Sequence, residues 1–239
     1  MSNWSQDENH YDKLRDQLLD KVNLKAYIDN PFLFMKRQRV TDYISRIELF
    51  KKIINIQGSI VECGVYKGGS LMLYYHLSSI FEPYGHNRKI IGFDTFEGFR
   101  SISERDCKLA EESIFSDTSY ELLKQAIELN DKNRTLSHIP KCEIVKGDAV
   151  YSIPDYRKNN PHLVIALLYI DFDLYEPTKV AIKELLPLVP KGGVVAFDEL
   201  NSKKWSGETE ALKEMLSLSS IKLQKFYFDP WPSYFIVGE

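Results

Sequence analysis

The chain has 239 residues and a formal net charge of −3, with 44% apolar and 27% charged side chains, as in an ordinary globular protein. This charge gives no electrostatic reason to expect nucleic acid or an anionic membrane, and no apolar run approaches the ~20 residues of a membrane-spanning helix. The polar, acidic N-terminus does not resemble a secretory signal, and three cysteines without a CxxC pair indicate reduced thiols. We therefore expect a soluble, cytoplasmic protein.

Helical and strand-like segments alternate along the chain. Apolar residues at helical spacing predict helices over residues 11–29, 40–54, 70–81, 119–130, 178–188 and 208–219. Short apolar runs predict strands over residues 59–63, 89–93, 142–145, 163–170 and 193–197, followed by a hairpin of residues 222–228 and 233–237. This order predicts an α/β fold with a doubly wound, mostly parallel, seven-stranded Rossmann-like sheet, an antiparallel C-terminal hairpin and a helical N-terminal extension.

No repeat, low-complexity segment or linker-like composition divides the chain. We expect a single domain over residues 1–239, with residues 1–55 as the helical extension and residues 56–239 as the ligand-binding core. Residues 99–118 are polar, lack a clear period and are long for a connection, so they form a candidate lid loop. The N-terminal helices suit packing on the same chain or across a symmetric dimer, which leaves a homo-oligomer open.

A glycine-rich turn, VECGVYKGGS, joins the first predicted strand to a helix. Gly64 allows the chain to turn sharply, and Gly68 and Gly69 allow a ligand to approach the helix N-terminus. The Glu-x-Gly-x-x-x-Gly-Gly spacing matches neither GxGxxG nor a phosphate loop, and without a lysine the helix N-terminus suits a carboxylate. Because Glu62 can pair with an amine, the turn predicts a site for the amino-acid part of S-adenosylmethionine.

The same turn also has a simpler interpretation, as a tight strand–helix connection that binds nothing. Two later strand ends favour the ligand. Asp94 ends the second predicted strand, where an acid in this fold accepts hydrogen bonds from a ribose, and Gly147-Asp148 follow the third, where an adenine would lie. The residues predicted to contact the methyl donor are Glu62, Gly64, Tyr66, Gly68, Gly69, Ser70, Asp94, Gly147, Asp148 and Asp171.

Four acids follow the fourth and fifth predicted strands: Asp171 and Asp173 in YIDFDLYEPT, and Asp198 and Glu199 in KGGVVAFDE. Such acids would repel one another in a partly dry cleft unless something positive lay among them. A hard divalent cation such as magnesium prefers carboxylate oxygens and is the natural solution. Taken singly, Asp173 would more simply cap the helix near Pro177, and Glu199 would be a solvated loop residue. The four together favour a functional site.

The motifs VECGVYKGGS, GFDTFEGF, YIDFDLYEPT and KGGVVAFDE, in this order, resemble the macrocin O-methyltransferase family (TylF, MycF and NovP type) of class I S-adenosylmethionine-dependent methyltransferases. The resemblance implies magnesium-dependent methylation of a hydroxyl on a sugar, a nucleotide-linked sugar or another sugar-containing metabolite. It also implies that Asp171, Asp198 and Glu199 hold the magnesium ion, and that Asp173 is the general base in a catalytic pair with Asp171. The family commonly has Asp-Asp after the fifth strand, so the pair Asp198-Glu199 is a departure.

Other functions stay open at this point. An NAD-dependent oxidoreductase would use the same sheet, although the glycine spacing disfavours it. A non-catalytic binding subunit or a hydroxylase relative would keep the sheet and change the chemistry, because a fold alone does not determine function.

Overall fold

The computed structural model describes residues 6–108 and 110–239, so residues 1–5 of the predicted extension and residue 109 of the predicted lid loop lie outside it. The chain divides into two compact units, residues 1–42 and 43–239. The first holds α1 (Gln6–Leu19), α2 (Leu24–Asp29), the 3-10 turn η1 (Pro31–Leu33) and the start of α3 (Arg37–Ile53). The single helix predicted over residues 11–29 is wrong, because the side chain of Asn23 accepts a hydrogen bond from the Ala26 amide (2.8 Å) and starts a second helix.

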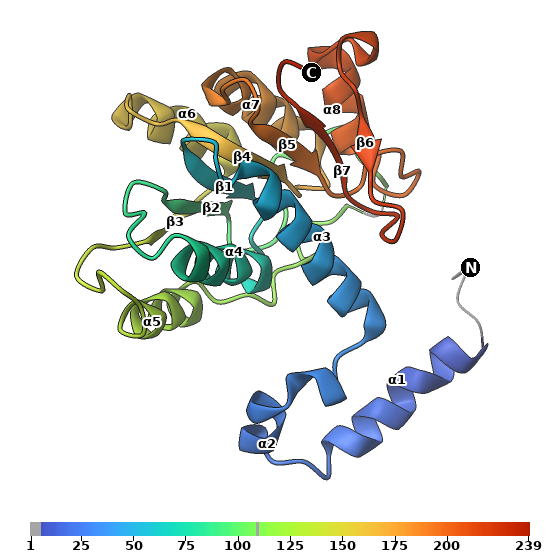
Figure 1. Ribbon diagram of the computed structural model, residues 1–239. Helices are drawn as coiled ribbons and strands as arrows, with labels where there is room; N and C mark the ends of the chain where they lie inside the picture. The colour runs from blue at the N-terminus through green and yellow to red at the C-terminus, as the bar shows by residue number, and fades with distance from the viewer. Residues whose placement is uncertain (1–5, 109) are drawn as a thin grey trace. The chain divides into compact units, whose positions relative to one another are not determined.

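Residues 43–239 contain a seven-stranded sheet of order β3-β2-β1-β4-β5-β7-β6 (Figure 1). Its strands are β1 (Ser59–Cys63), β2 (Ile90–Asp94), β3 (Cys142–Lys146), β4 (Ile165–Ile170), β5 (Val194–Phe197), β6 (Gln224–Lys225) and β7 (Ser233–Ile236). The first five run parallel, and β7 pairs antiparallel with both β5 and β6. The predicted doubly wound sheet with its antiparallel C-terminal hairpin is therefore confirmed.

Helices cover both faces of this sheet (Figure 1). The C-terminal half of α3, with α4 (Gly69–Phe81) and α5 (Tyr120–Asp131), packs on one face, and α6 (Ala149–Asn159), α7 (Tyr175–Leu185) and α8 (Gly207–Met215) pack on the other. Every residue of β1, β4 and β5 is buried, as expected for strands covered on both sides. The sequence pattern did not predict α6, which contains Pro154. Two 3-10 turns, η2 (Leu186–Leu188) and η3 (Leu218–Ser220), complete the elements.

None of the helices in the described part of the chain combines the length and the apolar character needed to cross a bilayer. The described residues between 99 and 118 contain no helix or strand. We call residues 99–118 the covering loop.

Candidate active site

A pocket of about 190 Å³ lies at the carboxyl ends of the parallel strands, which is where ligands bind in doubly wound folds. Six of the residues predicted to contact the methyl donor line it: Gly64, Tyr66, Asp94, Gly147, Asp148 and Asp171. The predicted base, Asp173, lines it as well. Glu62, Gly68, Gly69 and Ser70 are not among its lining residues. The structure thus brings most of the predicted donor site and part of the predicted acidic site into one cavity.

The three glycines of the turn after β1 have different surroundings. Gly64 has φ +93°, and a Cβ added there would lie 1.9 Å from the carbonyl oxygen of Asp171, so close packing against the end of β4 requires glycine. Gly68 has φ +85° and precedes α4, where a Cβ would lie 2.4 Å from a methyl group of Leu123. An added Cβ at Gly69 meets nothing within 4 Å. Packing therefore explains the first two glycines, and Gly69 alone faces open space.

Asp94 braces the glycine turn against the end of β2. One carboxylate oxygen accepts hydrogen bonds from the amides of Val65 and Tyr66 (both 2.8 Å), and the other accepts from the amide of Phe96 (2.6 Å). Burial raises the pKa of Asp94, and these hydrogen bonds oppose that effect. The predicted hydrogen bond to a ribose stays a prediction.

Asp148 lines the pocket and is the residue that caps the N-terminus of α6. It accepts a hydrogen bond from the Val150 amide (3.0 Å) as the helix cap and another from the Ser101 hydroxyl (2.6 Å) in the covering loop. Asp148 therefore joins the loop to the pocket wall, and its predicted contact with an adenine stays a prediction.

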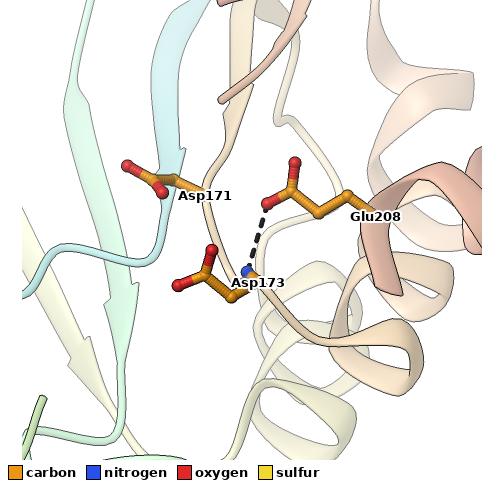
Figure 2. Close-up of side chains that lie close together, drawn as sticks. All are labelled: Asp171, Asp173 and Glu208. Atoms are coloured by element: carbon orange, nitrogen blue, oxygen red, sulfur yellow. Dashed lines mark hydrogen bonds between the residues drawn. The ribbon is translucent and has the colours of Figure 1, made fainter. Parts of the chain in front are cut away.

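Five acids form the second side of the site, and we call them the acid cluster: Asp171, Asp173, Asp198, Glu199 and Glu208. Carboxylate oxygens of Asp171, Asp173 and Glu208 lie within 4.8 Å of one another (Figure 2). Sequence reasoning missed Glu208, because it lies in the first turn of α8, nine positions beyond Glu199, in a helix with an ordinary amphipathic pattern. Its complete burial, which the pattern does not show, distinguishes it.

Burial and mutual repulsion raise the pKa values of Asp171, Asp173 and Glu208. Burial, together with Glu199 and Asp198, raises the pKa of Asp173 to about 7. Burial, Asp198 and Asp173 raise the pKa of Asp171 well above its usual range, and burial, Asp173 and Asp198 do the same to Glu208. The cluster therefore favours binding protons or a cation at neutral pH.

Part of the positive charge in the site belongs to Arg46 of α3, which sequence reasoning also missed. Its Nη2 atom lies 3.7 Å from Asp171 Oδ2 and 3.8 Å from Asp198 Oδ1, and its guanidinium carbon lies 4.6 Å from the centroid of the Tyr169 ring. Tyr169 in turn donates a hydrogen bond to Asp198 (2.6 Å). Burial opposes the charge of the guanidinium, but Tyr169 and Asp198 outweigh it and raise the pKa of Arg46. The guanidinium of Arg46 thus offsets part of the negative charge of these acids even without a bound cation.

Glu62, the acid predicted to pair with the donor's amine, is fully buried in β1. Burial raises its pKa to about 7, against the opposing effects of Arg46 and Ser70. The side chain therefore lies within electrostatic reach of the same arginine, and its contact with the donor stays a prediction.

The alternative role of Asp173 as a helix cap is not what the structure shows. Asp173 has a left-handed backbone (φ +60°), and Leu174, at the cap position of α7, makes no side-chain cap bond. The amide of Tyr175 instead donates to Asp106 Oδ1 (2.7 Å) in the covering loop. Asp173 is therefore not required to cap α7.

The covering loop is held on both sides of the pocket. Near its end, Asp117 accepts hydrogen bonds from the hydroxyl of Tyr66 (2.8 Å) and the ammonium of Lys67 (2.5 Å). Near its start, Phe99 packs edge-on against the buried Trp205, with ring centroids 5.8 Å apart. Its side chains Phe99, Arg100 and Phe115 line the pocket. The loop thus forms a wall of the site.

Comparisons with known proteins agree with this geometry. A profile of the family described as Macrocin-O-methyltransferase (TylF) matches residues 7–235. A crystal structure of CalS11, a calicheamicin methyltransferase, is 32% identical with a TM-score of 0.93, over 100% of this chain and 95% of that one. An apo structure of CalS11, described as a TDP-rhamnose 3'-O-methyltransferase, is 30% identical with a TM-score of 0.85, over 100% and 98%.

The O-methyltransferase NovP is 21% identical with a TM-score of 0.64, over 83% of this chain and 79% of that one, and this likeness shows the fold alone. A comparison with curated proteins found no match. The family predicted from the four sequence motifs is confirmed. The chain belongs to the macrocin O-methyltransferase (TylF) family and is an S-adenosylmethionine-dependent O-methyltransferase.

Proposed function

We propose that this enzyme methylates a hydroxyl of a sugar, with a nucleotide-linked deoxysugar as the first acceptor to test, and that it requires magnesium. The observation that carries the proposal is the acid cluster beside the pocket at the carboxyl ends of β4 and β5. CalS11, whose description names TDP-rhamnose, aligns with the whole of this chain, and this supports a sugar acceptor.

The residues present fit a magnesium ion. Three of the cluster's acids, Asp171, Asp173 and Glu208, bring carboxylate oxygens within 4.8 Å of one another, and hard divalent cations prefer these donors. Asp171 and Asp198 would hold the ion, because Ile170 pairs with Phe197 in the sheet and the next residue of each strand therefore lies at the same edge. Glu199 is the third proposed ligand. When bound, the ion lowers the pKa of an acceptor hydroxyl by Lewis acidity.

Asp173 is the proposed general base, with Asp171 beside it in the catalytic pair. Its pKa of about 7 leaves it partly ionised at neutral pH, as suits a group that accepts a proton in the reaction. The hydroxyl proton passes to the Asp173 carboxylate, the hydroxyl oxygen forms a bond to the methyl carbon, and the carbon–sulfur bond of the donor breaks to leave the thioether S-adenosylhomocysteine. The pocket contributes by holding the reacting atoms about 3 Å apart.

The covering loop is proposed to act as a lid. Its aromatic side chains Phe99 and Phe115 line the pocket and would exclude water from it. Its bonds through Asp106 and Asp117 would have to open for the donor to enter.

The proposal is tested by incubating the protein with S-adenosylmethionine and TDP-rhamnose and measuring the acceptor mass. We expect a methylated product with magnesium, no product with excess EDTA, and recovery when magnesium is restored. Full activity in EDTA would contradict the proposed requirement for magnesium. Absence of product from TDP-rhamnose and from a panel of free and nucleotide-linked sugars would remove the sugar acceptor.

A further inference from the structure

Glu208 joins the two segments that carry the other acids. Its Oε1 atom accepts hydrogen bonds from the backbone amides of Phe172 (3.0 Å) and Asp173 (3.2 Å), directly after β4. Its Oε2 atom accepts from the backbone amide of Glu199 (3.4 Å), directly after β5. Figure 2 shows the side chain reaching from α8 to the nitrogen of Asp173. One buried carboxylate thus contacts the backbone of both loops.

The start of α8 is built to bring Glu208 to this place. A Cβ added at the preceding residue, Gly207, would lie 2.6 Å from the amide nitrogen of Tyr175 and 2.6 Å from Asp106 Oδ1. Only glycine therefore lets the N-terminus of α8 approach the N-terminus of α7 so closely. This close approach carries Glu208, the next residue, to the end of β4.

The backbone of Asp173 is held in an unfavourable conformation at the same point. A φ of +60° is uncommon for residues other than glycine, and such conformations persist only where the surroundings impose them. The hydrogen bond from the Asp173 amide to Glu208 is one such constraint. It fixes the direction in which the Asp173 side chain leaves the chain.

We propose that Glu208 is a positioning residue, whose buried carboxylate sets the spacing between the loop that carries Asp171 and Asp173 and the loop that carries Asp198 and Glu199. This inference rests on the proposed function, in which those acids hold magnesium and accept the proton. It assigns Glu208 to the backbone of the two loops, whose amides its two oxygens contact.

The test uses the full-length protein with Glu208→Ala and Glu208→Gln, and Glu210→Gln as the matched control on an exposed position of the same helix. Hydrogen exchange of backbone amides is measured without metal, and the affinities for magnesium and for S-adenosylhomocysteine are measured by calorimetry. Alanine removes both acceptor oxygens. Glutamine keeps one acceptor and can serve only one of the two loops, which keeps the test usable if the alanine variant does not fold.

We expect Glu208→Ala to speed exchange at Phe172, Asp173 and Glu199 by at least about tenfold, and Glu208→Gln to do so in one loop only. Magnesium affinity should fall about 10- to 100-fold, as for other residues that orient metal ligands, with S-adenosylhomocysteine affinity within about twofold of wild type. Wild-type exchange at these amides, or equal loss of both affinities with faster exchange throughout the sheet, would overturn the inference. A wild-type protein that binds no magnesium would refute the proposed metal while the local exchange still reported on Glu208.

Discussion

The two sides of the pocket are built in different ways. The glycine-turn side is one continuous segment, residues 61–70, braced by a single carboxylate, Asp94, from the neighbouring strand. The acidic side draws on two helices and two strand ends, with Arg46 from α3 and Glu208 from α8 meeting the acids that follow β4 and β5. A side made from contiguous residues can be predicted from the sequence. A side made from distant residues depends on how the chain folds, so we expect substitutions there to have the largest effects.

The largest effect is expected for Asp173→Asn. Because asparagine cannot accept the hydroxyl proton, kcat/KM should fall about 100- to 10,000-fold. Donor affinity should change little, since the asparagine has almost the same shape. Steady-state kinetics with TDP-rhamnose measure the loss, and Asp155→Asn on the exposed face of α6 is the control. A loss of less than about tenfold would show that another group takes the proton.

The next effect is expected for Arg46→Met. The substitution leaves Asp171 and Asp198 without their buried cation, and removal of one partner from a buried ion pair typically lowers the free energy of unfolding by about 3 kcal/mol. Urea unfolding at pH 7 measures the change. Arg39→Met, which removes an exposed ion pair with Asp42 on the same helix, should cost less than about 1 kcal/mol. Equal losses in the two variants would contradict the role given to Arg46.

A smaller effect is expected from pH. The base must be ionised to accept a proton, so kcat/KM should rise with pH through the pKa of Asp173, which is about 7 without metal. A magnesium ion nearby favours the ionised form and lowers that pKa. At saturating magnesium the rising limb should therefore lie about one pH unit lower than at limiting magnesium, a roughly tenfold gain in kcat/KM at pH 5. A rising limb at the same pH for both magnesium concentrations would show that the metal does not change the pKa of the base.

Sequence periodicity was sufficient to predict the sheet, because each buried strand leaves a local apolar run. The acids directly after β4 and β5 were predicted because they follow two of these runs in the sequence. It was not sufficient for α6, which contains Pro154, nor for the two residues that organise the acid cluster. Arg46 lies in a helix with an ordinary amphipathic pattern, and its burial follows only from the packing of α3. Glu208 likewise becomes distinctive only when α8 docks against α7. Tertiary packing, which leaves no local periodicity, decides both positions.

The smallest effect is expected for Gly69→Ala, and it tests whether the glycine turn binds the donor. A Cβ there meets nothing within 4 Å, so the free energy of unfolding should change by less than about 1 kcal/mol. If Gly69 is needed because the donor approaches the N-terminus of α4, the added methyl group should weaken S-adenosylhomocysteine binding by about fivefold in calorimetry. An unchanged affinity would instead favour the simpler interpretation of this glycine as part of a tight connection. The donor would then be held by the residues that line the pocket, and the free space beside Gly69 would have no role in binding.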